Sequence, residues 1–135
     1  MTTPSNSEVL PVRAEQDIVT VRQRVRAQAL ALKLSVVDQT KIVTAASELA
    51  RNLWIYGGGG DVTLTLVTNG VRRGLRIDFV DQGPGIADLE QALRDGYTSG
   101  GGMGLGLGGA KRLVNDFEIE SAPGKGTRVS ITRWK

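Results

Sequence analysis

The sequence predicts an α/β protein, built as a two-layer sandwich with helices on one face of a mixed, mostly antiparallel sheet. Two features of the sequence lead to this prediction. Two long N-terminal segments repeat apolar residues at helical spacing, whereas the segments after residue 60 are rich in β-branched residues and bounded by glycine turns. The expected order is a strand, two helices, two strands, a long connection, a helix and two strands.

The length and composition predict one domain. The chain has 135 residues and is 40% hydrophobic, which is enough for one ordinary core. Residues 1–7 are polar and are expected to be disordered, so the folded domain is expected over residues 8–135. A strand over residues 8–13 is expected to lie at a sheet edge, because Pro11 cannot donate a backbone hydrogen bond.

Two helices are expected after this strand. Apolar residues recur at helical spacing between Glu15 and Lys33, which predicts a one-sided amphipathic helix. Asp38 is expected to be the N-cap of a second helix that runs to Tyr56. The glycine run at residues 57–60 is expected to end that helix.

The C-terminal half is expected to supply four strands and two helices. Asn69 and Gly70 separate two β-rich runs and are a strong signal for a hairpin. A short helix is expected within the glycine-rich connection, and a longer one directly after it. The expected strands are residues 61–68, 71–80, 117–121 and 127–134, and the expected helices are residues 86–94 and 107–115.

The composition excludes several kinds of chemistry. The chain has no cysteine and no histidine. Disulfides, thiolate and imidazole metal sites, Ser-His-Asp hydrolysis and phosphorylation of a histidine within the chain are therefore excluded. Acid or base chemistry must depend on carboxylates, lysine or tyrosine.

The charge pattern gives no reason to expect nucleic acid as a partner. Seventeen basic and fourteen acidic side chains leave a formal charge of +3, and the basic residues are scattered along the chain. No segment has the apolar length of a signal peptide or of a membrane span. We therefore expect a cytoplasmic protein with no membrane partner.

Glycine is concentrated in the connection before the last predicted helix, where residues 99–109 read SGGGMGLGLGG. Glycine lets backbone amides approach a ligand closely, so such a segment can surround phosphate oxygens with N–H donors. A flexible surface loop is the alternative interpretation. The match of Gly104, Gly106 and Gly109 to the dinucleotide fingerprint is discounted because no hydrophobic strand precedes it. A Walker A loop is absent as well, because the sequence at residues 124–126 lacks the hydroxyl after the lysine and the earlier glycine.

Glu48 and Asn52 are a candidate catalytic pair on the second predicted helix. They are four residues apart and so project from the same face. A carboxylate and a carboxamide on one turn suit a general base beside an oxygen ligand for Mg²⁺. Arg51 is close enough to pair with Glu48, so an ordinary polar helix face is the alternative.

Two more candidate segments lie at the ends of predicted strands. Asp81 follows an apolar strand, and its carboxylate can accept a hydrogen bond from the amino group of adenine, while Gly83 and Gly85 let the backbone turn beneath the base. Thr127 begins the last strand and would bring a hydroxyl near Asp81 if the two strands are neighbours. Taken alone, each segment could be a simple turn.

In order and spacing, these segments resemble the N, G1, G2 and G3 boxes of the GHKL ATPase superfamily. The matching segments are Glu48-x-x-x-Asn52, Asp81-x-Gly83-x-Gly85, Gly100 to Gly106, and Gly124-x-Gly126-Thr127. The resemblance implies the Bergerat ATP-binding fold, with ATP and Mg²⁺ as cofactors. A chain of 135 residues has no room for a transducer domain or dimerisation helices, and it looks closer to the RsbT-type switch kinases of the bacterial stressosome than to the anti-sigma factors.

This resemblance implies a serine/threonine protein kinase that acts on STAS-domain partner proteins. Glu48 would orient or deprotonate the acceptor hydroxyl, and Asn52 would ligate Mg²⁺. Asp81 would hold adenine, and Thr127 would support the base. Gly83 and Gly85 would belong to the same nucleotide site. The ATP lid would be formed by Gly100, Gly101, Gly102, Met103, Gly104, Leu105 and Gly106, with Gly101 at a place where the pattern has a lysine.

Two alternatives to this kinase prediction remain open. The first is an anti-sigma factor that has kinase activity and also sequesters a sigma factor. The second is a nucleotide-gated binding module that activates a PP2C-type phosphatase and turns over little ATP.

Overall fold

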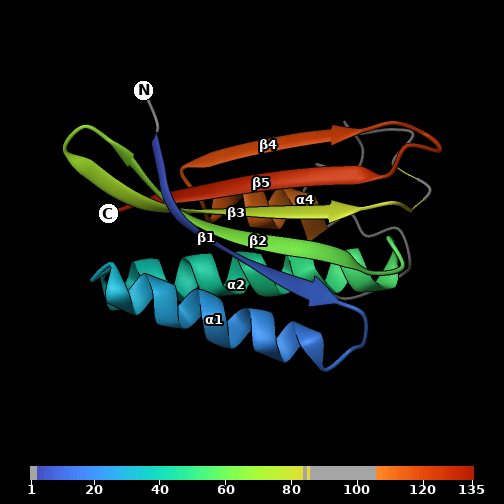
Figure 1. Cartoon of the computed structure of the whole chain (residues 1–135), viewed down its shortest axis with the longest axis horizontal. Coiled ribbons are helices and arrows are strands. Elements are labelled where there is room, and N and C mark those ends of the chain that lie inside the picture. Colours follow the sequence, from blue (N-terminus) through green and yellow to red (C-terminus); the bar gives the residue numbers. More distant parts are fainter. Residues whose placement is uncertain (1–2, 84, 86–105) are drawn as a thin grey trace.

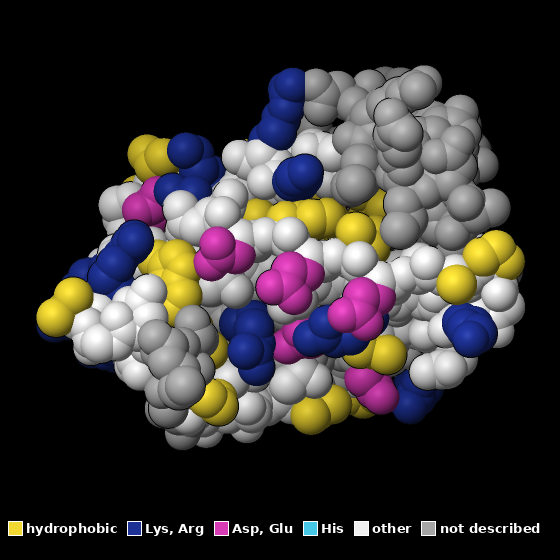
Figure 2. All heavy atoms as spheres, turned by 90° about the horizontal axis from the view of Figure 1, so that it is seen from above, with side chains coloured by type: hydrophobic (Ala, Val, Ile, Leu, Met, Phe, Trp, Pro, Cys, Tyr) yellow, Lys and Arg dark blue, Asp and Glu magenta, His cyan; other side chains and the backbone are white. Residues whose placement is uncertain are grey.

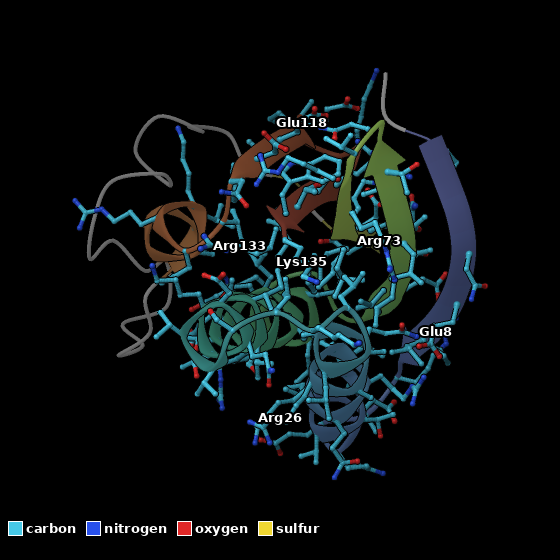
Figure 3. All side chains as sticks on the ribbon, turned by 90° about the vertical axis from the view of Figure 1, so that its left-hand side faces the viewer. Glu8, Arg26, Arg73, Glu118, Arg133 and Lys135 are labelled. Carbon is cyan, nitrogen blue, oxygen red and sulfur yellow. The ribbon has the colours of Figure 1, made fainter. Side chains whose placement is uncertain are left out.

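The computed structural model describes residues 3–83, 85 and 106–135. A five-stranded sheet forms one layer, and the helices of the described part of the chain lie on the same side of it (Figures 1 and 3). The helices are α1 (Asp17–Ala31), α2 (Val36–Ile55) and α4 (Gly106–Arg112). The strands are β1 (Thr3–Val12), β2 (Gly60–Asn69), β3 (Arg72–Asp81), β4 (Asp116–Ser121) and β5 (Thr127–Trp134).

The strand order is β1-β2-β3-β5-β4, and every neighbouring pair is antiparallel. The predicted α/β sandwich is therefore confirmed, but the expectation of a mixed sheet is wrong for the described strands. The reason lies in the connections. The α1–α2 pair joins the edge strand β1 to its antiparallel neighbour β2, and the hairpins β2–β3 and β4–β5 are antiparallel by construction.

The edge strand β1 begins at Thr3, earlier than the sequence predicts. Residues 3–7, which were expected to be disordered, pair with β2 instead, with a register shift between Pro4 and Asn6. The strand is also held from the side, because Arg24 of α1 donates hydrogen bonds to the Glu8 carboxylate. This contact with the Arg24 guanidinium holds the pKa of Glu8 below its usual range. Long-range pairing thus orders a polar segment whose composition predicts disorder.

The second helix starts three residues before the predicted position. Ser35 is its N-cap: the Ser35 backbone is extended, and its Oγ accepts a hydrogen bond from the Asp38 amide at 3.1 Å. Asp38 lies inside the first turn, where its carboxylate pairs with Arg133 of β5. The predicted N-cap, Asp38, is therefore wrong. Serine and aspartate both suit the N-cap position, and only the contact of Asp38 with the distant Arg133 distinguishes the two residues.

Helix α4 also differs from its prediction at the C-terminal end. It stops at Arg112 rather than continuing to Asn115. The Asn115 amide instead donates to the Thr132 carbonyl, which draws the chain into β4. The short helix predicted at residues 86–94 lies outside the described residues.

The β2–β3 hairpin is confirmed, with the turn displaced by one residue. Asn69 pairs with Arg72, so the two-residue loop is Gly70 and Val71. Gly70 has a φ of +83°, as a glycine at the first central position of such a turn requires.

One face of the sheet meets the helices, but burial is not confined to the core residues of this face, because Thr65, Ser130 and Thr132 are also buried. Buried apolar residues from β3 and β5 line this face, together with the partly buried Phe117 and Ile119 of β4. The register places them in rows across the strands, namely Ile77, Ile131 and Phe117 in one row and Phe79, Val129 and Ile119 in the next. Residues Asp81, Thr127 and Ser121 form the row after these, at the edge of the core.

The opposite face of the sheet carries interleaved charges. Figure 2 views the molecule from the side away from α1 and α2, and acidic and basic side chains alternate across this surface. Arg128 pairs with Asp78 at 3.0 Å and with Glu120 at 3.8 Å, and Arg76 pairs with Asp78 at 3.3 Å. Such a surface lacks the continuous positive potential that binds a phosphate backbone. None of the helices in the described part of the chain is long and apolar enough to span a membrane.

Candidate functional site

A polar row stands at one end of the sheet, where three strands place side chains on the helix-facing side. Asp81 ends β3, Thr127 begins β5 and Ser121 ends β4, and Thr127 is the register partner of both others. Because directly paired residues point to the same face, these three side chains continue the two apolar rows beside them. The expectation that Thr127 lies near Asp81 is confirmed by this register.

Glycines press closely around the Asp81 carboxylate. A Cβ added at Gly57, just after α2, would lie 2.5 Å from the Asp81 Cγ and 2.6 Å from its Oδ2. The Gly83 amide donates a hydrogen bond of 2.9 Å to Asp81 Oδ1. One carboxylate oxygen is therefore held by the backbone, and the other faces the end of α2. A side chain at Gly57 would therefore force the Asp81 carboxylate to move.

The backbone turns that flank this row also require glycine. Gly126 has a φ of +76°, and a Cβ there would overlap the Asp81 carbonyl oxygen. Gly85 has a φ of +79°, and a Cβ there would overlap the Ala122 carbonyl oxygen. The segment that follows β3 and the β4–β5 turn are thus in backbone contact.

Thr127 and Ser121 are joined by hydrogen bonds. The Ser121 and Thr127 hydroxyl oxygens are 2.8 Å apart, and Ser121 Oγ donates to the Gly126 carbonyl at 3.0 Å. A hollow of about 380 Å³ opens beside these residues and is lined by the whole row and by Gly126. Its lining also includes Val80, which faces away from the helices, so the hollow extends around the end of the sheet.

The candidate catalytic pair lies on α2, which leads into the same region. Glu48 and Asn52 are both partly buried and one helical turn apart. The Asn52 carbonyl accepts hydrogen bonds from Tyr56 and from Gly57, the residue that packs against Asp81. Asn52 is thus connected to Asp81 through Gly57, and Glu48 lies one turn farther back along the helix.

No ion pair or hydrogen bond joins the Glu48 carboxylate to another side chain within residues 3–83, 85 and 106–135. Arg51 is exposed, so the alternative of a surface pair between Arg51 and Glu48 has no support. A partly buried carboxylate without a cation beside it is available to accept a proton.

The predicted lid lies almost wholly outside the described residues. This holds for Gly100, Gly101, Gly102, Met103, Gly104 and Leu105. Gly106 is the first residue of α4, whose buried residues Leu107 and Ala110 belong to the core. Helix α4 packs on α2, so the described chain resumes beside the helix that carries Glu48 and Asn52.

The arrangement suits a nucleotide with a magnesium ion. The glycine cradle leaves the Asp81 carboxylate as a hydrogen-bond acceptor for a base. No group of three or more acidic side chains suitable for a metal occurs among the residues that the structure describes. A magnesium ion there would depend on an oxygen ligand such as the Asn52 carboxamide together with nucleotide phosphates, which is the usual way in which proteins hold Mg²⁺.

Comparison with known protein families identifies the class of protein to which the chain belongs. Residues 37–135 match the family described as histidine kinase-, DNA gyrase B- and HSP90-like ATPases. The chain belongs to this ATPase family. The predicted GHKL membership is confirmed, and the polar row, the α2 pair and the glycine turns lie within the matched segment.

Curated relatives narrow the class of ATPase. The serine/threonine-protein kinase RsbT of Bacillus subtilis is 42% identical over 123 residues, which cover 91% of this chain and 92% of RsbT. An anti-sigma F factor of Thermoanaerobacter is 31% identical over 119 residues, which cover 84% of this chain and 82% of that factor. Together with the family, the similarity to RsbT identifies the chain as an ATP-dependent protein serine/threonine kinase.

Solved structures support the fold of this kinase. The RsbU and RsbW domains of Rv1364c from Mycobacterium tuberculosis align with a TM-score of 0.62 at 20% identity, over 96% of this chain and 32% of that one. The SiaB–SiaC complex from Pseudomonas aeruginosa aligns with a TM-score of 0.52 at 14% identity, over 98% of this chain and 91% of that one. At these identities the likeness concerns the fold alone.

Two residues that contact Asp81 or Thr127 were not predicted from the sequence, namely Gly57 and Ser121. Gly57 belongs to a glycine run whose only predicted role was to end a helix. Ser121 follows Phe117 and Ile119 at a spacing of two, so the alternation of β4 could have placed it on the same face as Thr127.

Proposed function

We propose that this kinase transfers the γ-phosphoryl group of ATP to a serine or threonine hydroxyl of STAS-domain partner proteins, within a stress-signalling partner-switching pathway. The similarity to RsbT over nearly the whole chain supports this choice. The observation that carries the catalytic part is the Glu48 carboxylate, which is partly buried on α2 and unpaired within the described ranges. Because ATP is a cytoplasmic metabolite, the proposed reaction is a cytoplasmic one.

The nucleotide is proposed to bind with its base against Asp81 and Thr127. Gly83 and Gly85 would let the backbone pass beneath the base, and the segment from Gly100 to Gly106 would surround the phosphates with amide donors. Mg²⁺ is proposed to bind the Asn52 carboxamide, and when bound it would neutralise phosphate charge. The close fit of Gly57 and Gly83 around the Asp81 carboxylate supports this assignment.

Glu48 is proposed to be the general base. As the acceptor hydroxyl oxygen bonds to the γ-phosphorus, the bond from that phosphorus to the leaving oxygen of ADP breaks, and the hydroxyl proton passes to the Glu48 carboxylate. Phosphoryl transfer asks a protein mainly for positioning and charge neutralisation, so one carboxylate is sufficient.

The test compares Glu48→Gln with the wild-type kinase, using γ-labelled ATP and purified STAS-domain proteins from the same genome. We expect Glu48→Gln to bind ATP with nearly unchanged affinity and to transfer label at least about 100-fold more slowly. Arg51→Ala is the matched control, since Arg51 lies on the same helix but is exposed. Equal labelling by wild type and Glu48→Gln would exclude the catalytic assignment.

An anti-sigma factor with kinase activity is the second candidate, and the 31% identity to the Thermoanaerobacter anti-sigma F factor favours it. Affinity capture from the native cell extract distinguishes the two, because a sigma subunit is recovered only by an anti-sigma factor. A PP2C-type phosphatase is the second partner class that we propose. Stimulation of that phosphatase without labelling of any STAS-domain protein would favour a nucleotide-gated binding module over a kinase.

A further inference from the structure

We propose that Ser121 is a positioning residue, which makes the Thr127 hydroxyl a hydrogen-bond acceptor and so biases the site toward purines with an amino group at C6. The inference rests on the proposed function, in which the base binds against Asp81 and Thr127. It concerns the one member of the polar row for which neither the family pattern nor the sequence predicted a role.

The direction of the hydrogen bonds follows from the number of protons. A hydroxyl has one proton to donate, and a backbone carbonyl can only accept. The contact of 3.0 Å between Ser121 Oγ and the Gly126 carbonyl therefore uses the Ser121 proton. In the contact of 2.8 Å between Ser121 and Thr127, the donor must then be the Thr127 hydroxyl.

The acceptor that fixes this direction is itself held in place. Gly126 has a φ of +76° and packs against the Asp81 backbone so closely that a Cβ would overlap the Asp81 carbonyl oxygen. The Gly126 carbonyl cannot turn away without breaking this packing. The arrangement of Ser121 and Thr127 is therefore set by the backbone rather than by a freely rotating hydroxyl.

With its proton directed to Ser121, the Thr127 oxygen presents only lone pairs to a ligand. Asp81, its register partner on β3, presents a carboxylate oxygen on the same face. Two acceptors thus stand side by side. They match the amino group at C6 of adenine, which donates, and they oppose the carbonyl at C6 of hypoxanthine or guanine, which accepts. A binding site discriminates strongly against a ligand that leaves the polar groups of the site without hydrogen-bond partners.

The test measures equilibrium binding of ATP and of inosine triphosphate to the full chain. We expect the wild type to prefer ATP and Ser121→Ala to lower the ratio of ATP to inosine triphosphate affinity by about tenfold, the equivalent of one hydrogen bond. Without Ser121 the Thr127 hydroxyl is free to turn and donate to a C6 carbonyl. Ser121→Thr keeps the hydroxyl, so we expect its ratio of ATP to inosine triphosphate affinity to equal that of the wild type. A merely structural role of Ser121 would not require this equality.

An unchanged ratio in Ser121→Ala would overturn the inference, provided that thermal melting shows the variant to be folded. Asp81→Asn separates this failure from a failure of the proposed function. If Asp81→Asn loses ATP binding while Ser121→Ala keeps the ratio, only the role of Ser121 is wrong. If Asp81→Asn also binds ATP normally, the base does not bind against this row, and both proposals are wrong.

Discussion

The two ends of the central strands are built differently, although the same strands form both. At the end with Asp81, a carboxylate is surrounded by glycines and held by a backbone amide, with no cation paired to it among the described residues. At the other end, some 30 Å away along β3, polar side chains are paired with each other. Arg133 pairs with Asp38 of α2, and Trp134 donates from Nε1 to Asp116 at 2.8 Å.

We interpret the Asp81 end of the strands as the part that binds a ligand and the opposite end as a part that stabilises the fold. Arg133 and Asp38 are 95 residues apart in sequence, and their contact fastens β5 to the first turn of α2. The Arg133 Nη2 and the Asp38 carboxylate are thus paired within the fold, although the buried Arg133 Nε has no hydrogen-bond partner among the described residues. The groups at the Asp81 end are instead positioned but left partly unused, which is the arrangement that a ligand site needs. Substitutions at the two ends should therefore affect different measurements.

The largest expected effect is that of Asp81→Asn on ATP binding. Gly83 donates to Oδ1, so an asparagine must turn its oxygen toward Gly83 and its NH₂ group toward the base. That donor then faces the amino group of adenine. We expect affinity to fall at least about 100-fold, whereas the free energy of unfolding changes by less than about 1 kcal/mol because the bond to Gly83 remains. Calorimetric titration and urea unfolding measure the two quantities, and a loss of stability without loss of affinity would contradict the comparison.

Gly57→Ala is expected to have the next largest effect. The added methyl group would lie 2.5 Å from the Asp81 Cγ, so the carboxylate must move. We expect ATP affinity to fall about tenfold and stability to fall by about 1–3 kcal/mol. Gly58→Ala is the matched control: its Cβ meets nothing within 4 Å, but its φ of +74° is strained for alanine. It should lose about 1 kcal/mol of stability with normal ATP affinity, and a parallel loss of affinity in both variants would exclude the contact with Asp81 as the cause.

Asp38→Asn tests the opposite end and should leave ATP affinity unchanged. The hydrogen bond from Arg133 holds the pKa of Asp38 below its usual range. The Asp38 carboxyl group therefore binds a proton less readily in the folded state than in the unfolded state. Its contact with Arg133 stabilises the fold above the ordinary aspartate pKa of about 4, and this stabilisation is lost as the pH falls through the lowered pKa of Asp38. We expect Asp38→Asn to cost about 1–2 kcal/mol at pH 7 and progressively less toward pH 3. Urea unfolding across this range checks the sign, and an equal loss at every pH would point to a steric cause.

Most of the fold was predictable from local patterns, and two of the errors have a common origin. Helical spacing located α1 and α2, and β-branched runs located the strands to within a few residues. The segment 3–7 was expected to be disordered because its composition is polar, but pairing with β2 orders it. Asp38 was expected to be the cap, but its carboxylate is used by Arg133 and Ser35 caps the helix. Both of these errors concern a contact with a residue far away in the sequence, whereas the displacement of the β2–β3 turn by one residue is local.

The candidate site shows the same division. The residue types of Glu48, Asn52, Asp81 and Thr127 were recognisable from their order and spacing, and the register confirms that Asp81 and Thr127 are partners. The neighbours that shape the site were not recognisable. Gly57 and Ser121 gain their importance from what lies across from them, and neither has a local signal that separates it from an ordinary helix end or strand end.

By itself, the sequence determined the kinds of element, their order, the absence of histidine and cysteine chemistry, and the family of the kinase. These depend on periodicity, glycine positions and short motifs, which act over a few residues. Only the tertiary structure decided which side chains meet. Strand register is set by burying whole faces of the sheet at once, so the row of Asp81, Thr127 and Ser121 exists only after the apolar rows beside it have packed against the helices.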